Sequence, residues 1–181
     1  MSRTKQTSGS TGPTNPSTLF AEWDSINSQW KYWDKEAEAE KTLAQATPFI
    51  VLDQLTTVKG YNEPQKKAYW SNEVRRPSDK ITVRSKDGTE QEGTWRELKS
   101  SPIANHIKYT KSVYVLAKVG STYQLCNFQL KGSSLTAWIE FVDEIGGDKA
   151  LYGDNVIAVR EAIEKKKGSV VYNSPVFGIV S

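Results

Sequence analysis

From residue 47 onward the sequence alternates short β-branched or apolar runs with turn residues, and this pattern restricts the fold more than any other feature. Strands are predicted at residues 49–60, 70–74, 80–86, 112–119, 122–130, 156–163 and 169–180. Asp87-Gly88 and Gly120-Ser121 are typical of hairpin turns, while residues 94–99 and 133–145 favour short helices. Such a set indicates a mainly β domain over residues 47–181. We expect an OB-like barrel with one late inserted helix, and the alternative is a β-sandwich of jelly-roll type.

The first 46 residues have a different character. Residues 1–17 are rich in Ser, Thr, Gly and Pro without apolar periodicity, which predicts a flexible arm. Within it, SRTKQT at residues 2–7 resembles the start of a core histone tail, a short match that we interpret as coincidence or an added segment. Apolar residues then recur at helical spacing, which predicts an amphipathic helical segment over residues 18–46. The tryptophan-rich face of this helix either packs on the domain or pairs with a second copy through Trp23, Ile26, Trp30 and Trp33.

Positive charge is concentrated in residues 59–86. This stretch carries eight basic and three acidic residues, a net charge of +5, whereas the whole chain has a net charge of +3. Three large aromatics, Tyr61, Tyr69 and Trp70, alternate with the cations. This combination is typical of proteins that bind single-stranded nucleic acid, because cations contact phosphates and ring faces stack on unpaired bases. The alternative is a solvated hairpin whose rings pack inward.

These residues form the predicted binding site. The phosphate contacts are expected from Lys59, Lys66, Lys67, Arg75, Arg76, Arg84 and Lys86. Stacking is expected from Tyr61, Tyr69 and Trp70, and a second pairing of ring and cation occurs at Tyr109 and Lys111.

The residues needed for catalysis or metal binding are scarce. One histidine, His106, and one cysteine, Cys126, cannot form a zinc site or a Cys/His dyad, and no glycine-rich nucleotide-binding motif occurs. We therefore expect a non-catalytic protein without metal or small-molecule cofactor. No window approaches the ~20 apolar residues of a membrane span, and the single cysteine fits a reducing compartment, so a cytoplasmic location is expected.

Four phrases of the sequence resemble one known group of proteins. They are YWDKEAE at residues 32–38, PFIVLDQLTTVKGY at 48–61, YWSNEV at 69–74 and NFQLKGSSLTAWIEF at 127–141. Together they resemble the single-stranded DNA-binding proteins of crAss-like tailed phages of Bacteroidetes. The resemblance implies largely sequence-independent binding of single-stranded DNA during phage replication or recombination, in the infected host cell. The alternative is a structural or virion protein that assembles through the tryptophan-rich segment.

Overall fold

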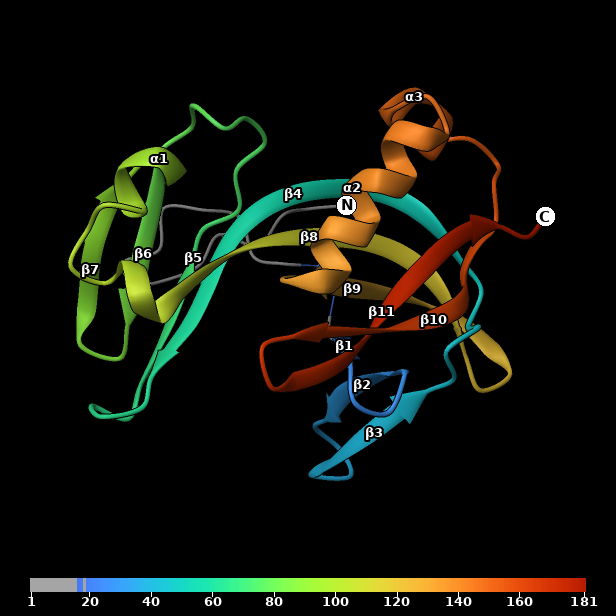
Figure 1. The fold of residues 1–181 in the computed structure, drawn as a ribbon, viewed down its shortest axis with the longest axis horizontal. Helices are drawn as coiled ribbons and strands as arrows, with labels where there is room; N and C mark the ends of the chain where they lie inside the picture. Colours follow the sequence, from blue (N-terminus) through green and yellow to red (C-terminus); the bar gives the residue numbers. More distant parts are fainter. Residues whose placement is uncertain (1–15, 18) are drawn as a thin grey trace. The chain divides into compact units, whose positions relative to one another are not determined.

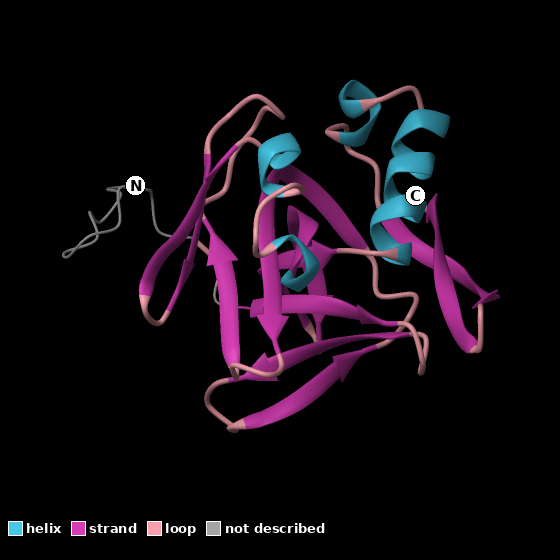
Figure 2. Cartoon of the chain, turned by 60° about the vertical axis from the view of Figure 1, so that its left-hand side comes forward, coloured by secondary structure: helices cyan, strands magenta, loops and turns pink. Residues whose placement is uncertain are grey.

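The protein is mainly β. The structure, a computed structural model, describes residues 16–17 and 19–181, so the predicted arm, including SRTKQT, lies almost wholly outside the described residues. In the described part, strands make up 55% of the structure and the helices are short (Figure 2). The strands are β1 (Leu19–Asp24), β2 (Gln29–Asp34), β3 (Ala39–Leu43), β4 (Phe49–Asn62), β5 (Lys67–Ser71), β6 (Ile81–Ser85), β7 (Gly88–Gly93), β8 (Ile107–Val119), β9 (Thr122–Leu130), β10 (Ile157–Lys167) and β11 (Val170–Ile179). The helices are α1 (Trp95–Leu98), α2 (Ser133–Glu144) and α3 (Asp148–Leu151), with a 3-10 turn at Ala104–His106.

The chain forms two compact units that share two long strands. Unit 1 contains Leu55–Ser112, and unit 2 contains Ser17–Gln54 and Val113–Ser181. The strands β4 and β8, teal and yellow in Figure 1, are each divided between the units, with one part in unit 1 and the other in unit 2. The sheet is mixed and open, so the prediction of a mainly β fold is confirmed, whereas a closed barrel is not seen in the described residues.

Unit 1 is an antiparallel sheet in the order β4-β5-β6-β7 with α1 following its last strand. Its core consists of the buried side chains of Val58, Tyr69, Val74, Ile81, Val83, Leu98 and Ile107. The predicted short helix is confirmed as α1, which Thr94 and Glu97 cap reciprocally, each side chain bonding to the backbone N–H of the other. Two N–H groups at the helix start are thereby satisfied.

Unit 2 combines a meander with a long hairpin. Its strands pair in the order β3-β2-β1-β9-β8-β4, with β1 antiparallel to β2, β2 antiparallel to β3, and β1 parallel to β9. The hairpin β10–β11 joins β4 at Ile157 and Phe49. The aromatic centre of the core is Trp30, which stacks on Phe128 with ring centroids 4.3 Å apart. Helix α2 packs against β11, and its Trp138 ring lies 5.0 Å from that of Phe177.

The predicted N-terminal helix is wrong, because residues 19–43 form β1, β2 and β3. Burial in β1 alternates residue by residue, the period of a strand. The helical spacing arose because Trp23 and Trp30, seven residues apart, are cross-strand partners rather than neighbours two helical turns apart. The turn between them is stabilised by Asp24, whose carboxylate accepts hydrogen bonds from the backbone N–H groups of Ile26 and Asn27.

The same device turns the chain between β2 and β3. Asp34 accepts from the backbone N–H groups of Glu36 and Ala37, and Glu38 has a φ of 48°. The helix propensity of EAEAE is therefore overridden by this turn and by strand pairing.

The late helix is confirmed as α2. Its buried face carries Trp138, Phe141 and Val142, whereas Ile139 is 46% exposed. The helix is preceded by Gly132 with a φ of 58°, and no serine side chain caps its first turn.

Candidate nucleic-acid interface

Three of the predicted site residues form one row across the sheet of unit 1. Lys59 on β4 pairs with Trp70 on β5, and Trp70 pairs with Arg84 on β6. Side chains at paired positions of an antiparallel sheet lie on the same face, with Cβ atoms about 4.5–5.5 Å apart. The indole of Trp70, 45% exposed, therefore lies between a lysine and an arginine.

A second exposed ring lies beside this row. Tyr61 follows Lys59 by two residues on β4, so it faces the same side, and its cross-strand partner is the small residue Ala68. Tyr61 is 47% exposed. Tyr61 and Trp70 are diagonal neighbours, a relation that places the two residues roughly 7–8 Å apart. We name Lys59, Tyr61, Trp70 and Arg84 the ring-and-cation face.

Tyr69 lies on the other face, so its predicted stacking role is wrong. It pairs with Gly60, is only 4% exposed and packs in the core of unit 1. Successive residues of a strand point to opposite faces, and Trp70 is the exposed member of this pair. The two aromatic neighbours therefore have separate roles, one in folding and one on the surface.

Lys67 is also removed from the predicted phosphate contacts. Its Nζ lies 2.9 Å from Asp87 and 3.0 Å from Glu90, and its side chain is 17% exposed. These two carboxylates raise the pKa of Lys67 well above its usual value. A cation held by two carboxylates stabilises the turn between β6 and β7 and cannot readily neutralise a phosphate.

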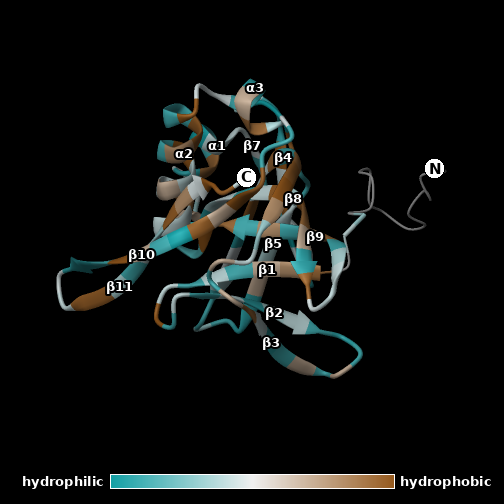
Figure 3. Ribbon diagram, turned by 90° about the vertical axis from the view of Figure 1, so that its right-hand side faces the viewer, coloured by the Kyte–Doolittle hydropathy of each residue, from teal (hydrophilic) through white to brown (hydrophobic). Residues whose placement is uncertain are grey.

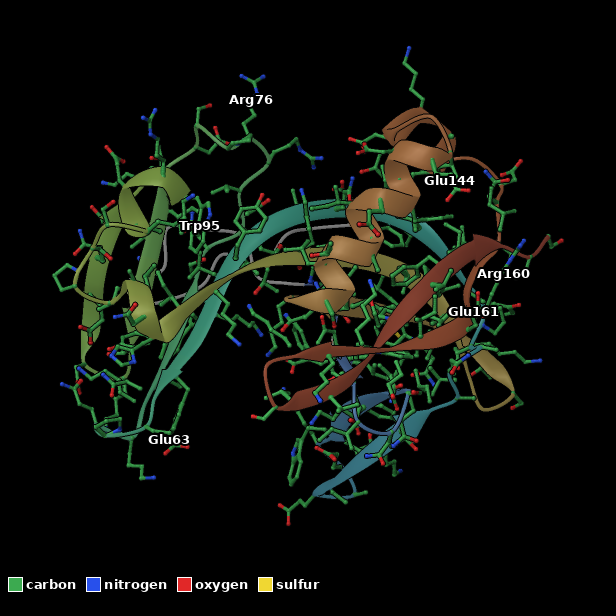
Figure 4. All side chains as sticks on the ribbon, in the orientation of Figure 1. Glu63, Arg76, Trp95, Glu144, Arg160 and Glu161 are labelled. Atoms are coloured by element: carbon green, nitrogen blue, oxygen red, sulfur yellow. The ribbon has the colours of Figure 1, made fainter. Side chains whose placement is uncertain are left out.

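Four predicted cations lie on exposed loops and turns of unit 1. Lys66 and Lys86 are in hairpin turns, and Lys66 makes an exposed ion pair with Glu63, 2.7 Å away. Arg75 and Arg76 lie in the loop before β6, and Figure 4 shows Arg76 extending away from the ribbon. The backbone N–H groups of these two arginines donate to the carboxylate of Asp79 at 3.2 and 2.8 Å, which holds the loop backbone in place.

One carboxylate shares the face with the row. Glu92 pairs with Thr82, two residues before Arg84, and accepts a hydrogen bond from the Thr82 hydroxyl at 3.0 Å. Its charge is compensated by Lys80, 2.5 Å away, whose hydrogen bond is the main cause of the lowered pKa of Glu92. The negative potential at the β7 side of the face is correspondingly reduced.

Tyr109 and Lys111 belong to a different cluster, on the core side of the sheet. They follow Ile107 at intervals of two residues on β8 and so share its face, and Ile107 is in the core of unit 1. The Tyr109 hydroxyl lies 3.0 Å from the Thr56 hydroxyl, which also accepts from Lys111 Nζ at 3.4 Å. Both side chains are half-buried and do not join the ring-and-cation face.

Trp95 was not predicted as a partner of this cluster. Its ring lies 5.4 Å from that of Tyr109, and it packs on the core of unit 1 from the start of α1 (Figure 4). The pattern of residues 94–99 indicated a short helix here, but no local signal indicated the distant tyrosine.

Cys126 is buried, which raises the pKa of its thiol to about 11 and keeps it protonated. Among the described residues no three His, Cys, Asp or Glu side chains gather to hold a metal ion. None of the helices in that part of the chain has both the length and the apolar character needed to cross a membrane.

Comparison with known proteins adds no relative: no protein-family model, no curated protein and no solved structure matches this chain.

Proposed function

We propose that this protein binds single-stranded DNA on the ring-and-cation face of unit 1, without chemistry and with little sequence preference. The observation that carries the proposal is the position of Trp70. It is an exposed indole in mid-strand, flanked in register by Lys59 and Arg84 and diagonal to the exposed Tyr61.

This arrangement suits unpaired bases better than a duplex. Every base has a π-face, so stacking on a ring is possible for any sequence, but the bases of a duplex are already stacked on one another. The two residues are diagonal neighbours roughly 7–8 Å apart, so each ring can stack on a different base of an extended strand. Lys59 and Arg84 lie on either side of Trp70, where the backbone of a strand stacked on that ring would run.

Cations outside the face extend the same surface chemistry. Lys66 and Lys86 occupy the hairpin turns of unit 1, and Arg75 and Arg76 its longest loop. Exposed cations at loops contribute through long-range attraction and counterion release rather than through fixed geometry. We therefore propose that the ring-and-cation face orients the bound DNA strand, and that the loop cations supply part of the affinity.

The sequence resemblance supports the same function. It relates four phrases of this chain to single-stranded DNA-binding proteins of crAss-like phages, and so adds a role in phage replication or recombination in the cytoplasm of an infected bacterium. An OB-like relationship of the fold stays a prediction, and the proposal does not depend on it, because a face of an open sheet also presents rings and cations.

A structural protein assembled through a tryptophan seam is the weaker alternative. The seam required Trp23, Ile26, Trp30 and Trp33 on one helix face. Instead, Trp23 and Trp30 are buried in the core of unit 2, and Ile26 and Trp33 are exposed at separate places on β-hairpins. With Trp23 and Trp30 in the core, the four residues do not form an exposed seam.

The test is binding of an end-labelled oligo-dT of about 8 nucleotides, followed by fluorescence anisotropy so that the reporter is independent of tryptophan. Trp70→Thr removes the ring and keeps a strand-forming residue. Trp33→Thr is the matched control, because Trp33 is also an exposed strand tryptophan, 57% exposed, but belongs to unit 2. We expect weaker binding for the first variant only, and little binding of a duplex of equal length by the wild type.

Salt dependence tests the cations separately. For single strands the plot of log K against log salt has a negative slope, and its magnitude decreases by about 0.7 for each phosphate contact that is lost. The pair Lys59→Gln and Arg84→Gln should therefore flatten the slope by about 1.4. Equal binding by Trp70→Thr and wild type, with an unchanged slope in the double variant, would refute the proposal.

A further inference from the structure

Two hairpins of unit 2 carry opposite charges at opposite ends of the unit. From this pair we infer that copies of this chain associate head to tail, with the β10–β11 hairpin of one copy docking on the β2–β3 hairpin of the next. The inference goes beyond DNA binding and does not require it.

The tip of the β10–β11 hairpin is basic and aliphatic. Residues 164–171 contain three lysines and one glutamate, a net charge of +2. None of the three lysines forms an ion pair within the part of the chain that the structure describes, and all are exposed. Across the hairpin, Lys166 pairs with Val171 and Lys167 with Val170, and these valines are 51% and 61% exposed.

The tip of the β2–β3 hairpin is acidic and carries an exposed indole. Residues 34–41 contain four carboxylates and two lysines, a net charge of −2. One carboxylate, Asp34, is held by Lys41 at 2.5 Å. The others are on exposed residues, and one of them, Glu40, lies directly across the hairpin from the 57% exposed Trp33.

The two tips cannot meet within one molecule. Both hairpins belong to unit 2, and in the view of Figure 3 they project in opposite directions, β10–β11 to the left and β2–β3 to the right. A surface and its complement at opposite ends of one body give a heterologous contact, which builds an open chain or a ring rather than a two-fold dimer.

The nature of the basic tip favours a protein partner over a nucleic acid. Its exposed apolar side chains, Val170 and Val171, are aliphatic and offer no ring face to a base, and Tyr172 is half-buried. The acidic tip offers what this tip lacks: carboxylates for the lysines, and an exposed indole to cover the valines. The two tips are therefore complementary in both charge and apolar surface. For this reason we take the partner of the basic tip to be the acidic tip of a second copy of the chain.

Sedimentation velocity without DNA tests the inference. At low salt we expect the weight-average sedimentation coefficient of the full chain to rise with protein concentration. It should return toward the monomer value when the Debye length is cut to about 3–5 Å by added salt. A wild type that stays monomeric at every concentration in low salt would overturn the inference.

Charge exchange gives the sharper test. One variant combines Lys165→Glu, Lys166→Glu and Lys167→Glu, and the other combines Glu36→Lys, Glu38→Lys and Glu40→Lys. Each alone has two tips of like charge, so its self-association constant should fall roughly tenfold or more. An equimolar mixture of the two regains opposite tips and should associate again. Failure of the mixture to associate, with both variants folded by circular dichroism, would contradict the inference.

The matched control reverses three exposed lysines elsewhere, Lys99→Glu, Lys108→Glu and Lys118→Glu, and so changes net charge by the same amount as the first variant. It should associate like the wild type. Equal loss in this control would assign the association to net charge and overturn the role of the hairpins. DNA is absent throughout, so these outcomes are independent of the binding test on unit 1.

Discussion

Tyr69 and Trp70 are adjacent on β5, and the structure predicts opposite consequences when each is removed. Tyr69 is 4% exposed and packs in the core of unit 1, whereas Trp70 is 45% exposed and lies between Lys59 and Arg84. Truncation of a buried aromatic costs about 3–5 kcal/mol, so Tyr69→Ala should lower the free energy of unfolding by an amount in this range. Loss of one stacking ring costs about 1–3 kcal/mol of binding, which is roughly a 5- to 150-fold rise in Kd for Trp70→Thr.

Two assays on the same variants separate the effects. Urea unfolding followed by circular dichroism gives the free energy of unfolding, and anisotropy of a labelled oligo-dT gives the affinity. For Tyr69→Ala, the affinity is normalised to the fraction of molecules that binds in a stoichiometric titration. We expect this variant to be destabilised but to keep its affinity per folded molecule, and Trp70→Thr to show the reverse.

The reasoning is refuted if both variants lose stability while neither loses affinity per folded molecule. That result would mean that the Trp70 ring is packed rather than available to a base. A loss of affinity in Tyr69→Ala equal to that in Trp70→Thr would instead mean that the face of the sheet is not the unit of recognition.

Two further predictions concern stability. Lys67 lowers the pKa values of Asp87 and Glu90, for the latter after the hydrogen bond from Ser85. Carboxyls with lowered folded-state pKa values stabilise the fold above their ordinary values of 3.8 and 4.5 and lose this contribution as the pH falls. The advantage of wild type over Lys67→Met in urea unfolding should therefore shrink below pH 4.5, and a constant difference would contradict the pairing. Trp138→Phe should cost about 1–3 kcal/mol more than Trp30→Phe, because the indole N–H of the equally buried Trp30 has no partner among the described residues while that of Trp138 is hydrogen-bonded; equal losses in urea unfolding would refute this.

Most strands could be predicted because their signals are local. Runs such as residues 49–60 and 122–130 contain their own pattern of β-branched and apolar residues and appear as β4 and β9. The N-terminal segment could not, because Trp23 and Trp30 are seven residues apart, a spacing that fits two turns of a helix and also a hairpin with six residues between the partners. The choice between them is made by pairing of β1 with β9, more than 100 residues away, which the local sequence does not contain.

The candidate site was predicted as a composition but not as a geometry. Charge and rings in residues 59–86 indicated the region, and Lys59, Tyr61, Trp70 and Arg84 share a face. Membership in that face depends on register, which sequence did not specify. Lys67 does not belong to that face because its ammonium group is paired with carboxylates on the neighbouring turn and strand.

Gly60 explains why Lys59 and Tyr61 face outward rather than into the core. A Cβ atom at residue 60 would lie 1.8 Å from the carbonyl oxygen of His106 and 2.8 Å from the Cα of Ile107, so only glycine fits beneath that backbone. A slip of β4 by one residue would bring Lys59 or Tyr61 to this position and is sterically blocked, which fixes the face on which both side chains emerge.

The same contact can be tested by adding a single methyl group. Because the obstacle is backbone, which has little freedom to move aside, Gly60→Ala should lose at least the ~1–3 kcal/mol typical of overpacked sites. Gly153→Ala is the control, since its nearest neighbour would be a side-chain nitrogen 3.4 Å away, an ordinary contact. Urea unfolding of the two variants measures the difference. If Gly60→Ala were as stable as Gly153→Ala, the backbone of His106 would not lie over Gly60. The outward orientation of Lys59 and Tyr61 would then lack its steric cause.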